Sequence, residues 1–186
     1  NQNLDLDEIK PNSMQVEALK NLEETRKENN RALLISATGT GKTYLSAFDV
    51  KQAKAKKILF VAHRKVILER SKISYQRILK NKKMEIFDNN FQINGKDEVV
   101  FAMVQTLNKE KNLNIFQKDY FDYIIIDEVH HGGAKTYQSI FEYFKPKFLL
   151  GITATPERTD DFNIYQLFNY NVAYEIRLQD AMKEEL

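Results

Sequence analysis

The chain has 186 residues, of which 42% are hydrophobic and 29% charged, and this composition suits one packed domain. It contains no cysteine, which excludes a disulfide framework and any thiolate metal site. No apolar run reaches the roughly 20 residues that a membrane-spanning helix needs, and no secretory signal is visible, so we expect a soluble, cytoplasmic protein.

The net charge of +2 hides a strong local asymmetry. The segment from Lys51 to Lys83 contains twelve Lys or Arg residues and a single acid, Glu69. Such a concentration of positive charge is typical of a surface that binds a nucleic-acid phosphate backbone. A solvated surface that only keeps the domain in solution explains the same charge equally well.

Helical and apolar segments alternate along the chain. After an irregular start, Pro11 with a cap at Asn12 or Ser13 predicts a helix that fades at residues 27–30. Helices are also predicted after the first and second strands, to about Ala55 and about Lys80, and at the end of the chain. The polar segment 88–97 is expected to be a turn or hairpin tip. Apolar runs predict strands at residues 31–36, 57–62, 84–87, 99–104, 123–126, 148–152 and 172–176.

Strands that are apolar on both faces and alternate with helices indicate a parallel sheet covered on both sides. The fold class is therefore predicted as α/β, with three layers and a mainly parallel sheet. In such a sheet ligands bind at the carboxyl ends of the strands. The polar residues that directly follow these strands should therefore lie along one edge.

A glycine-rich segment, Ser36–Thr43 (SATGTGKT), lies between the first strand and a helix. Its two glycines allow backbone N–H groups to turn toward a polyphosphate, and the helix start adds its own N–H groups and dipole. Lys42 can reach the β- and γ-phosphates, and the Thr43 hydroxyl can bind Mg²⁺. The strict motif has glycine where this chain has Ser36. The predicted ATP-binding residues here are Thr38, Gly39, Thr40, Gly41, Lys42 and Thr43.

An acidic pair follows the strand at 123–126. Asp127 can hold Mg²⁺, partly through water, across from Thr43. Glu128 can accept a proton from, or orient, the water that attacks the γ-phosphate. Carboxylates at a strand end also occur as ordinary loop caps, but the phosphate loop upstream favours the catalytic interpretation. The adjacent histidines at 130 and 131 lack a third ligand for zinc and are interpreted as polar contacts.

Three motifs in this order resemble motifs I, II and III of superfamily-two DNA and RNA helicases: Ala37–Thr43, Asp127–His130 and Thr153–Pro156. The resemblance is closest to the DExH-box branch that contains the helicase part of type III restriction enzymes and an excision-repair helicase subunit. Val61–Arg64 resembles motif Ia, and Val104–Leu107 resembles a later strand end of the same branch. The resemblance implies a RecA-like P-loop NTPase domain.

The resemblance also implies roles for the matching residues. Without the resemblance, Gln15 would be interpreted as a surface glutamine. With it, Gln15 matches the family's adenine-reading glutamine, although its spacing from Pro11 is longer than usual. The implied catalytic residues are Glu128 as base, Lys42 and Asp127. Residues that link the ATP state to nucleic-acid binding would be His130, Thr153 and Thr155. Residues on the nucleic-acid strand would be His63, Arg64, Gln105 and Thr106, and the basic segment around Arg64 agrees with this assignment.

The implied enzyme is an ATP hydrolase of the helicase type, which uses ATP and Mg²⁺ and couples hydrolysis to movement on nucleic acid, with DNA favoured over RNA. The family's glutamine after motif Ia is missing from Leu68–Ser71. Residues 1–186 also lack the second RecA-like domain and its arginine, so we expect a fragment that is weakly active or inactive alone. The expected partners are nucleic acid, that second domain, and nuclease or repair proteins, without a membrane. Two alternatives remain open: a restriction motor that translocates duplex DNA without unwinding it, and a nucleotide-gated nucleic-acid-binding module.

Overall fold

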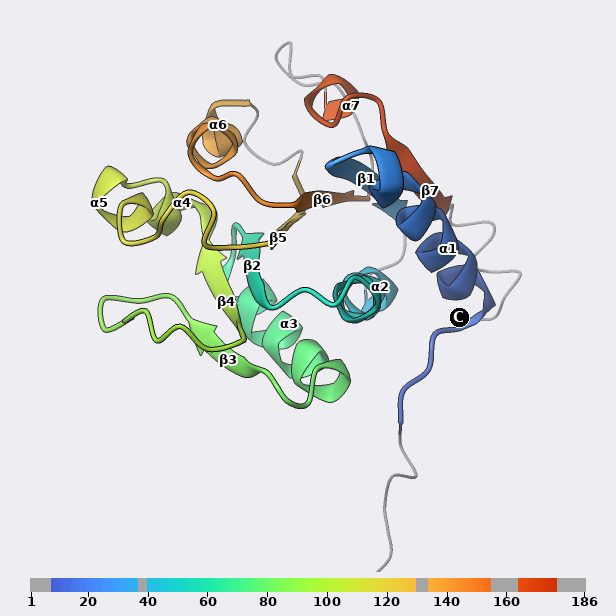
Figure 1. Cartoon of the computed structure of the whole chain (residues 1–186), viewed down its shortest axis with the longest axis horizontal. Helices are drawn as coiled ribbons and strands as arrows, with labels where there is room; N and C mark the ends of the chain where they lie inside the picture. The colour runs from blue at the N-terminus through green and yellow to red at the C-terminus, as the bar shows by residue number, and fades with distance from the viewer. Residues whose placement is uncertain (1–7, 37–39, 130–133, 155–163, 177–186) are drawn as a thin grey trace, which may run out of the picture.

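A seven-stranded sheet runs through the middle of the molecule, in the order β3-β4-β2-β5-β6-β1-β7 (Figure 1). The structure, a computed structural model, describes residues 8–36, 40–129, 134–154 and 164–176. Within these residues every pair of neighbouring strands is parallel. The strands are β1 Arg31–Ser36, β2 Lys57–Ala62, β3 Lys83–Ile86, β4 Glu98–Met103, β5 Tyr123–Asp127, β6 Phe148–Thr153 and β7 Val172–Ile176.

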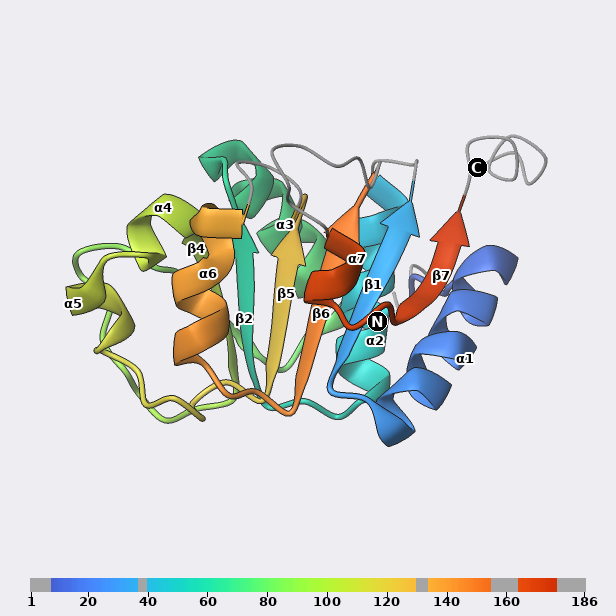
Figure 2. The same ribbon diagram turned by 90° about the horizontal axis from the view of Figure 1, so that it is seen from above.

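Helices cover both faces of this sheet, which confirms the predicted three layers (Figure 2). One face carries α1, α2 and α3, and the other carries α4 to α7. None of these helices, within the ranges described, is long and apolar enough to cross a membrane. The helices are α1 Ser13–Glu28, α2 Thr40–Gln52, α3 Lys65–Ile78, α4 Val104–Leu107, α5 Glu110–Leu113, α6 Ala134–Tyr143 and α7 Ile164–Leu167.

The central strands are apolar at successive positions because both of their faces are buried. In β2, Ile58 and Phe60 pack into the cluster under α1, α2 and α3, while Leu59 and Val61 pack into the cluster under the other helices. Burial of each such side chain contributes about 1.5–3 kcal/mol. The predicted strands agree with the observed ones to within one residue, and for the central strands this double burial is the reason.

Two predictions about connections need correction. Residues 88–97 contain the predicted turns but do not form a hairpin tip, because β3 and β4 are parallel and pair from Lys83↔Glu98 to Ile86↔Phe101. Short polar turns carry the chain back, with the backbone N–H groups of Asn90 and Lys96 donating to the side chains of Asp88 and Asn94. The helix α2 ends at Gln52 rather than near residue 55, since Lys54 is left-handed with φ 57°. The predicted terminal helix falls outside the described residues.

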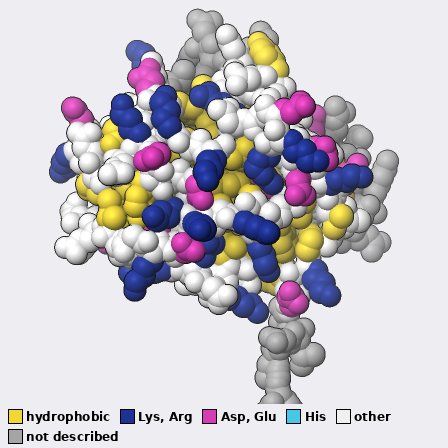
Figure 3. All heavy atoms as spheres, viewed as in Figure 1, with side chains coloured by type: hydrophobic (Ala, Val, Ile, Leu, Met, Phe, Trp, Pro, Cys, Tyr) yellow, Lys and Arg dark blue, Asp and Glu magenta, His cyan; other side chains and the backbone are white. Residues whose placement is uncertain are grey.

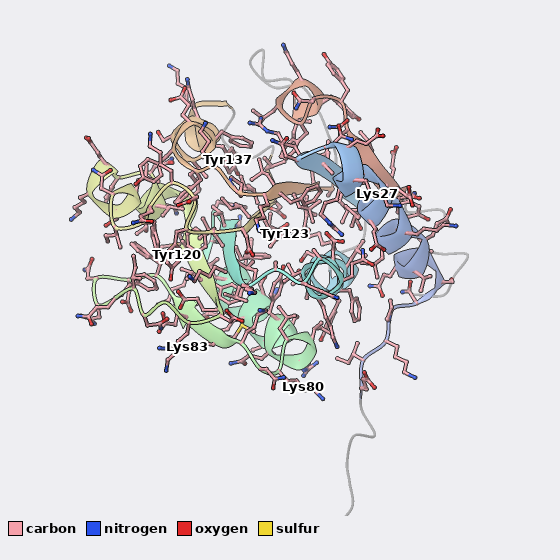
Figure 4. The ribbon with its side chains drawn as sticks, viewed as in Figure 1. Lys27, Lys80, Lys83, Tyr120, Tyr123 and Tyr137 are labelled. Atoms are coloured by element: carbon pink, nitrogen blue, oxygen red, sulfur yellow. The ribbon has the colours of Figure 1, made fainter. Side chains whose placement is uncertain are left out.

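A buried ionic cluster joins three elements at the opposite end of α2 from the glycine-rich segment. Asp49 is fully buried and accepts hydrogen bonds from both terminal nitrogens of Arg26, at 2.7 and 3.0 Å. The Tyr123 hydroxyl also donates to Asp49, and burial raises the pKa of Tyr123 (Figure 4). Removing one member of a buried pair costs about 3–5 kcal/mol because the other charge stays buried. Asp49 therefore fastens α1, α2 and β5 together.

A close contact at Gly151 fixes the packing of the last described segment against β6. A side-chain Cβ at Gly151 would lie 2.3 Å from the ring carbon Cζ of Phe168, which is fully buried. The ring occupies the space that any larger residue at 151 would need. Phe168, which lies between α7 and β7, can therefore pack on β6 at position 151 because this residue has no side chain.

We expect Gly151→Ala to lower the free energy of unfolding by about 1–3 kcal/mol, because the added methyl group must displace the Phe168 ring. Urea denaturation of the two proteins measures this difference. The double variant Gly151→Ala with Phe168→Leu should lose less stability than the sum of the two single variants, because the smaller side chain relieves the overlap. Equal stability of Gly151→Ala and the original chain would contradict this account.

Candidate active site

The strand ends that carry the predicted motifs lie next to one another at the carboxyl edge of the sheet. Four neighbouring strands, β2, β5, β6 and β1, end there in nearly the same register. Ile35 pairs with Thr153, and Asp127 pairs with Ile152. The prediction that the polar residues after these strands share one edge is confirmed.

Lys42 lies in the first turn of α2 and points into this edge. It is only 8% exposed, and its Nζ lies 3.3 Å from Asp127 Oδ1 and 3.7 Å from Glu128 Oε1. A lysine from the glycine-rich segment thus meets both acids that follow β5. The first turn of a helix also has free backbone N–H groups and the positive end of the dipole, which together favour an anion such as phosphate. Thr43 follows in the same turn.

Asp127, the last residue of β5, is almost completely buried. Its Oδ1 makes no hydrogen bond to any described residue and lies 3.3 Å from the Lys42 ammonium nitrogen. Burial raises the pKa of Asp127, and the nearby Lys42 ammonium opposes this rise. A buried carboxylate oxygen with spare acceptor capacity fits Mg²⁺ held through water. Among the described residues no group of three or more His, Asp or Glu side chains that could hold a metal ion is found. Mg²⁺ in proteins usually takes several of its ligands from water and from phosphate.

Glu128 has an unusual backbone. Its φ of 51° is left-handed, which costs a residue with a side chain about 1–2 kcal/mol. Two hydrogen bonds hold this turn: the Tyr137 hydroxyl on α6 donates to the Glu128 carbonyl at 3.0 Å, and the Val129 N–H donates to the Ile152 carbonyl at 3.1 Å (Figure 4). The Glu128 side chain is 33% exposed, and its Oε2 lies 3.6 Å from His63 Nδ1. The carboxylate is therefore open to water, whereas that of Asp127 is not.

Gln15 is not a surface residue, because it is only 8% exposed and contacts the start of α2. Its Nε2 donates to the Gly41 carbonyl at 3.1 Å. It also completes a capping box with Asn12, which confirms Asn12 as the helix cap: Gln15 N donates to Asn12 Oδ1 at 2.9 Å, and Asn12 N donates to Gln15 Oε1 at 3.0 Å. The start of α1 is thereby fixed beside the glycine-rich segment.

The four residues predicted for the nucleic-acid strand follow two neighbouring strands, β2 and β4. Gln105 is exposed, and its Nε2 donates to the His63 carbonyl at 3.1 Å. Arg64 is exposed at the start of α3, and the Thr106 carbonyl accepts from Asn112 Nδ2 at 2.7 Å. These residues lie together, and His63 connects them to Glu128.

The remaining predicted residues divide into two groups. Thr153 is fully buried at the end of β6, and Thr40 is the first residue of α2. The other predicted residues lie outside the described part of the chain: Thr38, Gly39, His130, His131 and Thr155. Tyr137 was not predicted from the sequence, and the only signal for it is the apolar face of α6 on which it lies.

The basic segment 51–83 does not gather around Arg64, so that expectation is wrong. It contains a whole strand, β2, and a whole helix, α3, each of which crosses the sheet. Arg64 and Lys65 therefore lie at the carboxyl edge, whereas the two ends of the segment lie at the amino edge. The charge is split between opposite sides of the molecule.

We expect Lys42→Met to raise the pKa of Asp127 further, because the substitution removes the cation that opposes the effect of burial. A titration followed by the ¹³C resonance of the Asp127 carboxyl group measures this pKa. Lys51→Met removes the same charge at the other end of α2 and should leave the pKa of Asp127 nearly unchanged. An unchanged or lower pKa in Lys42→Met would contradict the contact.

Comparison with known proteins finds relatives among restriction enzymes and helicases. The type I restriction enzyme EcoAI endonuclease subunit of Escherichia coli is 30% identical over 193 residues, which cover 94% of this chain and 23% of that protein. Another relative, a putative ATP-dependent RNA helicase of Acanthamoeba polyphaga mimivirus, is 31% identical over 86% of this chain and 30% of its own length. The chain thus spans between a fifth and a third of these two relatives.

A solved structure shares the fold. The structure of a nuclease-deletion mutant of the type ISP restriction-modification enzyme LlaGI, in complex with a DNA substrate mimic, superposes with a TM-score of 0.77 and 18% identity, covering 95% of this chain and 21% of that one. At this identity the likeness concerns the fold alone. The family model described as "Type III restriction enzyme, res subunit" matches residues 8–158. The chain belongs to this family, within the superfamily-two helicases that its motifs resemble.

Proposed function

We propose that the chain is the first RecA-like ATPase domain of a motor that couples ATP hydrolysis to movement on DNA. The observation that carries this proposal is the contact of Lys42 with both Asp127 and Glu128 at the carboxyl edge of the sheet. A lysine that neutralises two acids in this position can exchange them for the phosphates of a nucleotide. The exchange would free Asp127 for Mg²⁺ and Glu128 for water.

The proposed roles follow from what each group can bind. Lys42 and the backbone N–H groups of the first turn of α2 hold the phosphates, and Thr43 with Asp127 holds Mg²⁺, which would neutralise phosphate charge. Glu128 accepts the proton of the attacking water, because its carboxylate is open to solvent. Asp127 is buried and is therefore poorly placed to accept this proton.

Gln15 has hydrogen-bonding capacity left for an adenine base. An amide offers two N–H donors and two acceptor lone pairs. One donor is used by the Gly41 carbonyl and one acceptor by the Asn12 N–H. The remaining donor and acceptor match the edge of adenine, which presents a donor beside an acceptor.

The proposed nucleic-acid contacts are linked to the catalytic base by a short path. Glu128 lies beside His63, and the His63 carbonyl accepts from Gln105. A shift of Glu128 on nucleotide binding would therefore reach residues that follow β2 and β4. Thr153, His130 and Thr155 are proposed to link the ATP state to nucleic-acid binding, and Thr153 lies at the end of β6. DNA is favoured as the track because the relatives include restriction enzymes.

A second candidate function is the motor subunit of a restriction system, which translocates duplex DNA without separating its strands. The family match favours it. In this case, as in the first, we propose that a second RecA-like domain completes the ATP site and that nuclease or repair proteins act beside it. The two candidates differ in whether strand separation accompanies ATP turnover.

The first test is ATP turnover by the protein together with its second RecA-like domain, in the presence of single-stranded DNA, duplex DNA or RNA. We expect DNA to stimulate turnover, and Glu128→Gln to reduce the stimulated rate by about 10²-fold or more, because the base is lost. Glu110→Gln, an exposed residue of α5, is the matched control and should keep full activity. Undiminished turnover in Glu128→Gln would contradict the assignment of the base.

A separate expectation concerns the chain of residues 1–186 alone. It should bind a fluorescent ATP analogue weakly and hydrolyse ATP slowly, since an arginine from another domain can contribute about 10³–10⁵ in rate. Adding the second domain in trans should raise the rate. Rapid DNA-stimulated hydrolysis by a verified monomer of the chain would show that the site needs no second domain.

A further inference from the structure

We propose that the amino edge of the sheet is a second DNA-binding surface, which holds the phosphate backbone of a duplex on the side opposite the ATP site. We call it the amino-edge basic surface and define it by six side chains. These are Lys51, Lys54, Lys56, Arg77, Lys80 and Lys82. The proposal does not depend on ATP hydrolysis and extends the proposed function to a region that the helicase motifs do not include.

The six residues come from two connections that the fold places near each other. Residues 51–56 comprise the end of α2 and its connection to β2, and residues 77–82 comprise the end of α3 and its connection to β3. Both connections lie at the amino edge, because they precede parallel strands. Since β4 alone separates β2 from β3, the two strand starts are about 9–10 Å apart. Residues that are distant in sequence thus lie on the same face, and Figure 3 shows many Lys and Arg side chains on it, with fewer acidic side chains between them.

A hollow of about 400 Å³ lies between the two connections. Four basic side chains line it, from Lys51, Arg77, Lys80 and Lys82, with two acids, Glu8 and Asp97. The Arg77 side chain, which lines the hollow, is held by a hydrogen bond of 3.0 Å from its Nη1 to the Tyr44 hydroxyl. The excess of positive charge and the concave shape suit an oxyanion such as a backbone phosphate.

The lysines of this surface have no acidic partner within the described part of the chain. Other lysines do pair, as Lys83 with Glu85 at 2.6 Å and Lys27 with Glu24 at 2.9 Å (Figure 4). No such ion pair involves Lys51, Lys54, Lys56, Lys80 or Lys82 among the residues described. Their charges remain available to a ligand from outside the molecule.

A protein partner fits this surface less well than DNA does. Protein interfaces have an exposed apolar centre. Here the apolar side chains Phe48, Ile78 and Leu79 that line the hollow are buried, and none of the large apolar side chains that are strongly exposed in the described residues lies in segments 51–57 or 77–83. A phosphate backbone needs only cations, and it gains affinity from the counterions that they release. The surface has five lysines and one arginine, so it should hold the backbone without reading bases.

The test measures binding of a fluorescein-labelled duplex of about 30 base pairs by fluorescence anisotropy, without nucleotide, from about 50 to 200 mM NaCl. The variant changes Lys51, Lys54, Lys80 and Lys82 to Gln. Each lost phosphate contact lowers the slope of log K against log salt by about 0.9, so we expect a slope smaller by about 3–4. Affinity for a fluorescent ATP analogue should be unchanged, which separates this result from failure of the ATP site.

The matched control changes four exposed lysines that do not line the hollow, Lys20, Lys109, Lys111 and Lys135, to Gln and removes the same charge. Its salt slope should stay close to that of the original chain. Equal slopes in the amino-edge variant and the original chain, or an equal fall in the control, would overturn the proposal. It would also be overturned if the amino-edge variant lost binding of polyglutamate while keeping that of DNA, which would assign the surface to an acidic protein segment.

Discussion

Parallel pairing of all the described strands is the constraint on which the rest of the structure depends. Each strand must start at one edge of the sheet and end at the other, so every connection has to cross a face. As a result, residues that follow strands meet at the carboxyl edge and residues that precede strands meet at the amino edge. Lys42, Asp127 and Glu128 come from distant parts of the chain and meet for this reason alone. The same rule brings the two basic connections together at the other edge.

Two ionic contacts at opposite ends of α2 hold this helix in place. Near its start, Lys42 contacts the acids after β5, and near its end Asp49 accepts from Arg26 of α1 and from Tyr123 at the start of β5. The two contacts differ in what surrounds them. Asp49 has several donors and a structural role, whereas Asp127 keeps an oxygen without a hydrogen bond among the described residues. Helix α2 is thus fixed at one end and open to a ligand at the other.

Much of the fold was predictable, because strands buried on both faces are continuous apolar runs, as in Ile124–Ile126. The place of the acidic pair at the carboxyl edge also followed from its position after a strand. Other features depend on contacts that no local pattern records. Gln15 looks polar and exposed until α2 is placed beside it, and β3 looks like half of a hairpin until its parallel pairing is known. The prediction of basic charge around Arg64 failed because the charges were counted along the chain. In the fold, β2 and α3 each run from one edge of the sheet to the other, so these charges lie at opposite edges.

The double use of Gln15 has a thermodynamic consequence. The same amide closes the first turn of α1 and binds the start of α2. The binding of any ligand that adds hydrogen bonds to this amide without breaking those two is therefore linked to formation of the helix. Bound ligand must raise the free energy of opening the first turn of α1, and opening of this turn must weaken ligand binding by the same free energy. Amide hydrogen exchange at the start of α1 would then report on events at a nucleotide base. The stability of the α1 cap would therefore depend on whether the ligand is bound.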